Sequence, residues 1–357
     1  MNANACELLK RKIHESGLDS LLVVKHPNIR YLTGFDGGSG YAAVTPHETA
    51  LFVNALFLED AYATVGKHVT VHETGDDVFG LFGALGEPFW GTRIGYEADA
   101  VVCSFYRKFG DAVKSAETVP CEGYVEELRE CKEPREIEAI RTAQRLSESV
   151  FRETLSLIRE GVEEREIAWE IDYRLRKLGG ERSSFDTIVA FGPNASKPHA
   201  APSDRKLRPG DFVLIDMGTV VEGYASDMTR TLVFGKADAR QREVYHAVLA
   251  AQEAVLERIS SGMECADVDR IARKALRDAG LDKEFLHSLG HGVGLEVHES
   301  PRLSRTSKAV LRNGSVVTVE PGVYIPGWGG VRIEDMVLVT ERGCENLTEV
   351  EKELVEV

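Results

Sequence analysis

Two aspartates stand inside hydrophobic runs in DFVLIDMGTVVEGYASDMTRTLVF, residues 211–234. Carboxylates in such surroundings are rare unless they are paired or bind a metal. Asp216 and Asp227 are eleven residues apart. A tight turn centred at Val221-Glu222 would place them opposite each other on one face of a hairpin, with Cβ atoms ~4.5–5.5 Å apart. Because two carboxylates at this distance repel each other, the pattern predicts a shared proton or a cation between them.

A second segment, GSVVTVEPGVYIPGWGGVRIEDMVLVT (residues 314–340), repeats this design. It reads as a strand, a glycine-rich turn and another strand. Glu320 follows the first apolar run, and Glu334 lies within the second. Their midpoint is Gly327, inside the turn, so these two acids are also predicted to meet across a hairpin in apolar surroundings.

A histidine completes the set. LHSLGHGVGLEVHESP (residues 286–301) places His291 between glycines, where the backbone allows close approach, with His287 and His298 nearby. Four carboxylates and one imidazole form a hard-ligand set that favours Mn²⁺, with Co²⁺ or Zn²⁺ as alternatives. Two divalent ions ~3.5–4 Å apart would balance four acids better than one ion, and would hold a hydroxide between them.

Each residue also has a simpler explanation. A buried aspartate on a strand is often satisfied by backbone amides or by an arginine, and Arg230 and Arg332 are available as such partners. A histidine flanked by glycines is often only a loop residue. The occurrence of all five groups in two matched hairpins favours the metal site.

The elements that position these residues fall into two parts. Residues 1–120 alternate strand and helix patterns, which predicts an α/β domain with a mixed sheet. Expected strands are 18–24, 41–46, 48–53, 68–73 and 92–97, and expected helices are 5–17 and 54–66. A long amphipathic helix begins at Glu133-Pro134 with Glu136 in its first turn. The predicted domains are residues 1–123 and 124–357.

The second part contains an internal repeat. Residues 155–180 align with 256–281 at an offset of 101, and Gly161 matches Gly262. Each copy predicts a helix, a glycine break and a second helix, followed by strands. Two similar halves around a pseudo-two-fold axis would bring their strand faces together at one central site, although a chance match of amphipathic helices is the alternative.

Composition narrows the class of partner. The chain has 357 residues and a net charge of −15, which argues against nucleic acid and against an anionic membrane surface. The sequence has no apolar run of 18 residues, and the N-terminus does not read as a secretory signal. Six scattered cysteines are typical of reduced thiols in a cytoplasmic protein.

Several motifs together resemble the pita-bread metallopeptidases, specifically the proline-peptidase branch of Xaa-Pro dipeptidase (prolidase) and aminopeptidase P. The motifs are DMGTVVEGYASDMTRT, GHGVGLEVHE, VEPGVYIP, RIEDMVLV, SFDTIVAFGPNASKPHAAP, VEELRECKEPREIEAIRTA and NIRYLTGF. The resemblance implies a creatinase/prolidase-like first domain and an α+β catalytic domain with pseudo-two-fold halves around a curved antiparallel sheet. It also implies a homodimer that acts on an Xaa-Pro dipeptide or short peptide, without nucleic-acid or membrane partners.

The resemblance further implies a dinuclear site whose ligands are Asp216, Asp227, His291, Glu320 and Glu334, with Asp227 and Glu334 bridging both ions. The expected reaction is hydrolysis of the Xaa-Pro bond in dipeptides by a hydroxide held between the two metals. Release of the N-terminal residue from longer Xaa-Pro peptides is the alternative.

The same resemblance suggests roles for the residues around the metals. Glu320 would act as general base and His298 would stabilise the oxyanion. His199 would contact the substrate, and Arg332 would hold negative charge near the site. His287 corresponds to a further active-site position.

Three other readings of the fold compete with this one. They are a non-catalytic peptide-binding module, a metal-free enzyme acting on creatine-like substrates, and a methionine aminopeptidase. The complete ligand set argues against the first two, and the additional first domain argues against the third. That first domain departs from the family pattern at Asn54-Ala55-Leu56.

Overall fold

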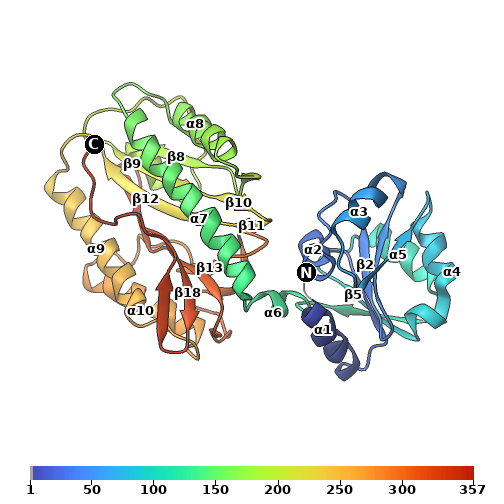
Figure 1. Ribbon diagram of the computed structural model, residues 1–357. Coiled ribbons are helices and arrows are strands. Elements are labelled where there is room, and N and C mark those ends of the chain that lie inside the picture. Colours follow the sequence, from blue (N-terminus) through green and yellow to red (C-terminus); the bar gives the residue numbers. More distant parts are fainter. Residues whose placement is uncertain (1–2) are drawn as a thin grey trace. The chain divides into compact units, whose positions relative to one another are not determined.

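The computed structural model describes residues 3–357, which form two compact units divided between Arg129 and Glu130 (Figure 1). The boundary that we propose from the sequence, near residue 123, precedes this division. Each unit has its own hydrophobic core.

The first unit is built on a six-stranded sheet in the order β4-β3-β2-β1-β5-β6. Strand β1 pairs antiparallel with β2 and parallel with β5, so the predicted mixed sheet is confirmed. The strands are β1 (Ser20–Val23), β2 (Tyr41–Val44), β3 (Thr49–Val53), β4 (Val69–Glu73), β5 (Arg93–Glu97) and β6 (Glu117–Cys121). The helices are α1 (Ala3–Glu15), α2 (His26–Thr33), η1 (Ala55–Phe57), α3 (Leu58–Thr64), α4 (Val78–Trp90), α5 (Cys103–Ala112) and α6 (Glu126–Arg129).

The second unit combines paired helices with antiparallel strands. Its helices are α7 (Pro134–Thr154), η2 (Leu155–Leu157), α8 (Glu164–Lys177), η3 (Gly192–Ser196), α9 (Ala239–Leu256) and α10 (Cys265–Asp278). Its first strands are β7 (Arg182–Ser183), β8 (Ile188–Phe191), β9 (Phe212–Met217), β10 (Thr219–Val221), β11 (Tyr224–Ala225) and β12 (Met228–Val233). The later strands are β13 (Gly290–Gly292), β14 (Glu299–Leu303), β15 (Val316–Val319), β16 (Gly322–Ile325), β17 (Gly329–Arg332), β18 (Asp335–Thr340) and β19 (Gly343–Asn346).

Helix α7 begins where the sequence predicts. Glu133 is its N-cap, Pro134 occupies the first helical position, and a capping box joins Glu133 to Glu136. Helices α7 and α8 pack on strands β8, β9 and β12, whereas α9 and α10 pack on β15 and β18 (Figure 1). These two layers of helices enclose the strands that carry the acidic residues.

The internal repeat is visible in the backbone. Gly161 and Gly262 both have positive φ, 80° and 89°. Gly161 N–H donates to Leu207 O at 2.9 Å, and Gly262 N–H donates to Leu311 O at 2.8 Å. The two aligned glycines therefore make similar hydrogen bonds in both halves, which supports the repeat.

The register of the first hairpin differs from the prediction. Met217 is paired with Met228 and Asp216 with Thr229, so Asp227 is the diagonal neighbour of Asp216 on the same face. The turn is centred on Glu222 and Gly223, whose φ values are 48° and 79°. A two-residue hairpin turn of type I′ requires positive φ at both central positions, and glycine favours the second. The predicted centre at residues 221–222 was therefore one residue too early.

The register of the second hairpin confirms the prediction. Val319 pairs with Asp335 and Gly322 with Arg332, and both pairs have their midpoint at Gly327. Glu320 and Glu334 fall between these pairs and therefore face each other.

The backbone pairing between the two arms of this hairpin is interrupted at Glu320 and Glu334. Glu320 N–H donates to Leu289 O at 2.9 Å, and Glu334 N–H donates to Thr229 O at 3.1 Å. Each acid is thus fixed by a different neighbouring element.

Within residues 3–357, no helix combines the length and the apolar character that a membrane crossing needs. All six cysteines lie in this range and are free thiols.

Candidate metal centre

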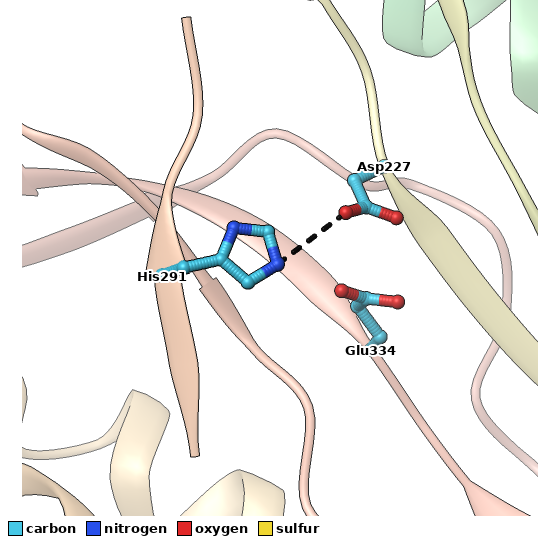
Figure 2. A group of neighbouring side chains, drawn as sticks. All are labelled: Asp227, His291 and Glu334. Carbon is cyan, nitrogen blue, oxygen red and sulfur yellow. Dashed lines mark ion pairs between the residues drawn. The ribbon is translucent and has the colours of Figure 1, made fainter. Parts of the chain in front are cut away.

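Three side chains form the centre of the site. Asp227 directly precedes β12, His291 lies in β13, and Glu334 connects β17 to β18. One potential ligand atom from each lies within 4.8 Å of the other two, and Figure 2 shows the three groups converging. The distance from His291 Nε2 to Asp227 Oδ2 is 3.6 Å. Two carboxylates and one imidazole from three separate elements thus share one small volume.

Glu320 adds a third carboxylate. Its Oε1 atom lies 3.4 Å from His291 Nε2. Thr318 contacts both residues, since its hydroxyl donates to Glu320 Oε1 at 3.3 Å and accepts from the main-chain amide of His291 at 3.1 Å.

Asp216 supplies the fourth carboxylate and is held by Arg332, whose Nη2 donates to Asp216 Oδ2. Of the two arginines that offered a simpler explanation for the buried aspartates, Arg332 does pair with Asp216, whereas Arg230 pairs with Asp335. The second oxygen, Asp216 Oδ1, is buried and has no hydrogen-bond partner among the described residues. An unsatisfied carboxylate oxygen in this position is available to a cation.

The acids disturb one another. Burial, together with the charge of Glu334, raises the pKa of Asp227 and of Glu320 well above the ordinary carboxyl range. Burial and the charge of Asp216 raise the pKa of Glu334 to about 8. The protein alone therefore lacks the positive charge needed to ionise these groups at neutral pH, and divalent cations would provide it.

His291 is prepared to act as a ligand through Nε2. Burial lowers the pKa of His291 to about 4, so the ring is neutral at physiological pH. Its Nδ1 lies 3.1 Å from Gly292 O, which requires the proton on Nδ1 and leaves the Nε2 lone pair facing the acids. Metal-binding histidines commonly donate their other N–H to a carbonyl in this way.

His287 belongs to a hydrogen-bonded chain beside these groups. Its Nδ1 lies 2.7 Å from Ser288 O and its Nε2 lies 2.8 Å from the Tyr324 hydroxyl. Arg332 Nη1 donates to the same hydroxyl at 2.7 Å. Burial, followed by the charge of Arg332, lowers the pKa of His287 to about 3. The ring is therefore neutral, with Nδ1 as donor and Nε2 as acceptor.

His298 and His199 lie at the open side of the site. The ring of His298 is 4.2 Å from that of His291, measured between centroids. Both His298 and His199 are exposed, and the charge of His199 acts on His287 and on His298. His298 and His199 therefore lie beside the histidines of the site, as the sequence analysis expects.

The loop that carries His199 is fixed from both ends. Pro198 O accepts a hydrogen bond from Arg332 Nη1 at 3.2 Å. Glu164 is fully buried and accepts from Phe191 N–H at 2.7 Å and from Ser203 N–H at 2.9 Å. The buried carboxylate therefore closes the loop behind His199.

Comparison with known proteins identifies the family. Residues 138–341 match the metallopeptidase family M24, and residues 6–131 match the creatinase/prolidase N-terminal domain. The first match covers more than half of the chain. The chain belongs to metallopeptidase family M24. The predicted family is confirmed, and membership in M24 implies divalent metal ions in this centre.

Individual M24 relatives span nearly the whole chain. An Xaa-Pro dipeptidase of Pyrococcus furiosus is 36% identical over 350 residues, covering 98% of this chain and 99% of that protein. The structure of an Xaa-Pro dipeptidase from Bacillus anthracis matches with a TM-score of 0.96 and 35% identity, covering 100% of both chains. An X-Pro aminopeptidase from Thermotoga maritima matches with a TM-score of 0.90 and 33% identity, covering 97% of this chain and 100% of that chain. These structures confirm the predicted fold class.

The sequence analysis did not identify three residues that contact the side chains of the metal centre: Thr229, Thr318 and Tyr324. Thr229 donates to Glu334 Oε2 at 2.6 Å and accepts from Arg332 Nε at 3.0 Å. Strand alternation counted from Asp227 would have placed Thr229 on the same face. Thr318, two residues before Glu320, follows by the same rule. Tyr324 gave no comparable signal, because an apolar strand explains a tyrosine equally well.

Proposed function

We propose that the chain is a metal-dependent Xaa-Pro dipeptidase. The observation that carries this proposal is the convergence of four carboxylates on one neutral imidazole, with raised carboxyl pKa values and an unsatisfied oxygen on Asp216. The naming of the relatives as Xaa-Pro dipeptidases supports the choice of substrate. An Xaa-Pro bond has no N–H at the proline, so a site that recognises it must work without that donor.

The proposed ligands are Asp216, Asp227, His291, Glu320 and Glu334. Asp227 and Glu334 lie at the centre of this group with His291, so these three residues would form the core of the ligand set. When bound, the ions would lower the pKa of a water molecule and polarise the scissile carbonyl. Oxygen-rich coordination favours Mn²⁺, with Co²⁺ or Zn²⁺ as alternatives.

Glu320 is the proposed general base. A carboxylate beside the other ligands is placed to accept the proton of the attacking water. The hydrogen bond from Thr318 holds Oε1 beside His291. This leaves Oε2, which lies 3.9 Å from His287 Nδ1, as the second proton-accepting atom of Glu320.

The remaining residues would bind and orient the dipeptide. His298 lies beside His291, with the two rings tilted by 51°, and is exposed, so it is placed to donate to the developing oxyanion. His199 approaches from its loop and would contact the substrate backbone or the proline carboxylate. Arg332 supplies a fixed positive charge, and His287 would support it through Tyr324.

Several finer points belong to the same proposal. The six free cysteines support a cytoplasmic location, and the resemblance to the proline-peptidase branch supports a homodimer, which light scattering would test. The alternative substrate class is a longer Xaa-Pro peptide, as the aminopeptidase among the structural relatives suggests.

One experiment separates these functions. The protein is stripped with a chelator, reloaded with Mn²⁺ and incubated with Ala-Pro and, separately, with Ala-Pro-Ala. Dipeptidase activity predicts rapid release of proline from Ala-Pro and slow cleavage of the tripeptide, and aminopeptidase P predicts the reverse order. The Asp227→Asn variant serves as the matched inactive control. Absence of hydrolysis of either peptide by the reloaded protein would contradict the proposal.

A further inference from the structure

Arg230 lies on the opposite face of β12 from the candidate ligands. Asp227 and Thr229 face the metal centre, and Arg230 points the other way, between Met228 and Leu232 of an apolar cluster. Its side chain is 2% exposed. A guanidinium in such surroundings is tolerated only when its N–H donors are satisfied.

All five N–H groups of Arg230 have acceptors. Nη1 donates to Glu334 O at 2.6 Å and to Thr229 O at 3.0 Å. Nη2 donates to Asp335 Oδ1 and to Val350 O, each at 2.8 Å. Nε donates to Glu351 O at 3.2 Å. The guanidinium therefore joins three segments: β12, the chain at Glu334-Asp335, and the end of the chain.

The contact with Glu334 is direct. Arg230 donates a hydrogen bond to the main-chain carbonyl of Glu334. The main-chain carbonyl of Thr229 accepts from the Glu334 amide, and the Thr229 hydroxyl donates to Oε2 of the Glu334 carboxylate. Both backbone groups of Glu334 and one of its carboxylate oxygens thus depend on residues 229 and 230. These residues belong to the first half of the unit, whereas Glu334 belongs to the second.

Asp335 anchors the same cluster. It is fully buried, and its second oxygen accepts from Asn346 Nδ2 at 2.7 Å and pairs with Lys352 Nζ at 3.1 Å. The C-terminal segment, residues 350–357, continues beside β12. There, Val233 N–H donates to Val355 O and Val357 N–H to Val233 O, both at 3.0 Å.

We propose that Arg230 is a positioning residue for the metal centre, and that it couples the C-terminal segment to the geometry of Glu334. This inference rests on the proposed metal centre. Arg230 touches neither substrate nor reacting atoms. It fixes where the Glu334 carboxylate lies relative to Asp227, and partners that orient metal ligands typically contribute ~10–100-fold to metal affinity.

The test compares the full-length wild type with Arg230→Met by Mn²⁺ titration calorimetry of the metal-free proteins. The variant is expected to bind Mn²⁺ ~10–100-fold more weakly. Arg230→Lys, which keeps the charge but has fewer donors, should lie between the two. The Lys352 side chain is more exposed than that of Arg230, and Lys352→Met removes one partner of Asp335. This variant should therefore fold even if Arg230→Met fails to fold. It should bind Mn²⁺ several-fold more weakly than the wild type.

A matched control separates positioning from lost stability. Leu175→Ala removes a fully buried side chain of α8 from the same apolar cluster without touching a hydrogen bond of Arg230. It should unfold at lower urea concentration yet bind Mn²⁺ as the wild type does. Folded Arg230→Lys and Lys352→Met variants with wild-type affinity would overturn the inference and leave the metal centre standing. A wild type that takes up no divalent ion would refute the centre itself.

Hydrogen exchange gives a second readout that needs no catalysis. The Gly235 and Val357 amides donate hydrogen bonds between the C-terminal segment and the end of β12. If Arg230 couples this region to the metal centre, Mn²⁺ should slow hydrogen exchange at both amides. The slowing should disappear in Arg230→Lys and persist in Leu175→Ala. Equal slowing in all three proteins would contradict the coupling.

Discussion

Asp216 and Arg332 form a buried ion pair in which one carboxylate oxygen, Asp216 Oδ1, has no hydrogen-bond partner among residues 3–357. Arg332 therefore stabilises Asp216 even without a metal. This separates Asp216 from the other acids of the centre, which are surrounded mainly by one another. We therefore expect Asp216→Asn and Glu334→Gln to change the stability of the metal-free protein in opposite directions.

Asp216→Asn should destabilise the metal-free protein. Removing one partner of a buried ion pair leaves the Arg332 charge uncompensated and typically costs about 3–5 kcal/mol. Urea denaturation of the chelated protein at pH 7.5 measures this loss. An unchanged midpoint would mean that the pair carries little of the stability.

Glu334→Gln should stabilise the metal-free protein at the same pH. The substitution removes a carboxylate whose ionisation is opposed by burial and by Asp216, and a gain of about 1–3 kcal/mol is expected because each pKa unit is worth ~1.4 kcal/mol. With saturating Mn²⁺ the order should reverse, because the wild type gains binding energy that the variant lacks. The same denaturation series with and without metal shows whether the curves cross.

The stability of the metal-free protein should fall as pH rises from 6.5 to about 8. Glu334 has a folded pKa of about 8 against an ordinary 4.5, so its protonated form stabilises the fold and this contribution is lost as pH rises. His287 and His291 have folded pKa values of about 3 and 4 against 6.5, so their contribution is complete above pH 6.5. Of these three groups, Glu334 therefore accounts for the change within this window. Thermal denaturation at half-unit pH steps tests this, and Glu334→Gln should show a smaller slope.

Glu320→Gln should abolish most of the turnover. Loss of a general base typically lowers kcat by about 10²–10⁴-fold. Because Glu320 is also a proposed ligand, kcat must be measured at saturating Mn²⁺. Thr318→Val is the control, since it removes the hydrogen bonds of the Thr318 hydroxyl to Glu320 Oε1 and from the His291 amide but keeps the Glu320 carboxylate. Full activity of Glu320→Gln would exclude it as the base.

Tyr324→Phe should disconnect His287 from Arg332. The substitution removes the hydroxyl that lies 2.8 Å from His287 Nε2 and receives Arg332 Nη1. Nitrogen NMR of the histidines would show whether His287 keeps its proton on Nδ1, and kinetics would show a rise in KM for Ala-Pro larger than the fall in kcat. A normal His287 signal would show that Ser288 alone fixes the ring.

The sequence predicts part of this site well because local patterns determine it. Glu320 and Glu334 lie where the midpoint at Gly327 places them, since a glycine-rich turn and two apolar strands leave one register open. In the first hairpin the turn lies one residue later than predicted, so Asp216 pairs with Thr229 and not with Asp227. The reason is that Glu222 takes a positive φ, which the turn type requires and the sequence does not indicate.

The remaining features depend on contacts between distant segments. The sequence offered Arg230 as a partner for the aspartates. In the structure, four of its five hydrogen-bond acceptors belong to distant residues, namely 334, 335, 350 and 351. Glu164 closes the loop of His199 from a helix that precedes it by many residues. No periodicity encodes such pairings, so they emerge only from the assembled fold. In the first unit, helices α2, α4 and α5 and strand β6 were likewise not predicted.

The opening of the second hairpin at Glu320 and Glu334 has a consequence for how the protein matures. Asp216 and Asp227 leave the ribosome long before Glu334, and Glu334 reaches its place only when its amide meets Thr229. A growing chain therefore carries an incomplete set of donors until Glu334 has been synthesised. The complete set of donors therefore exists only where residues 229 and 334, from the two halves of the second unit, are already in contact.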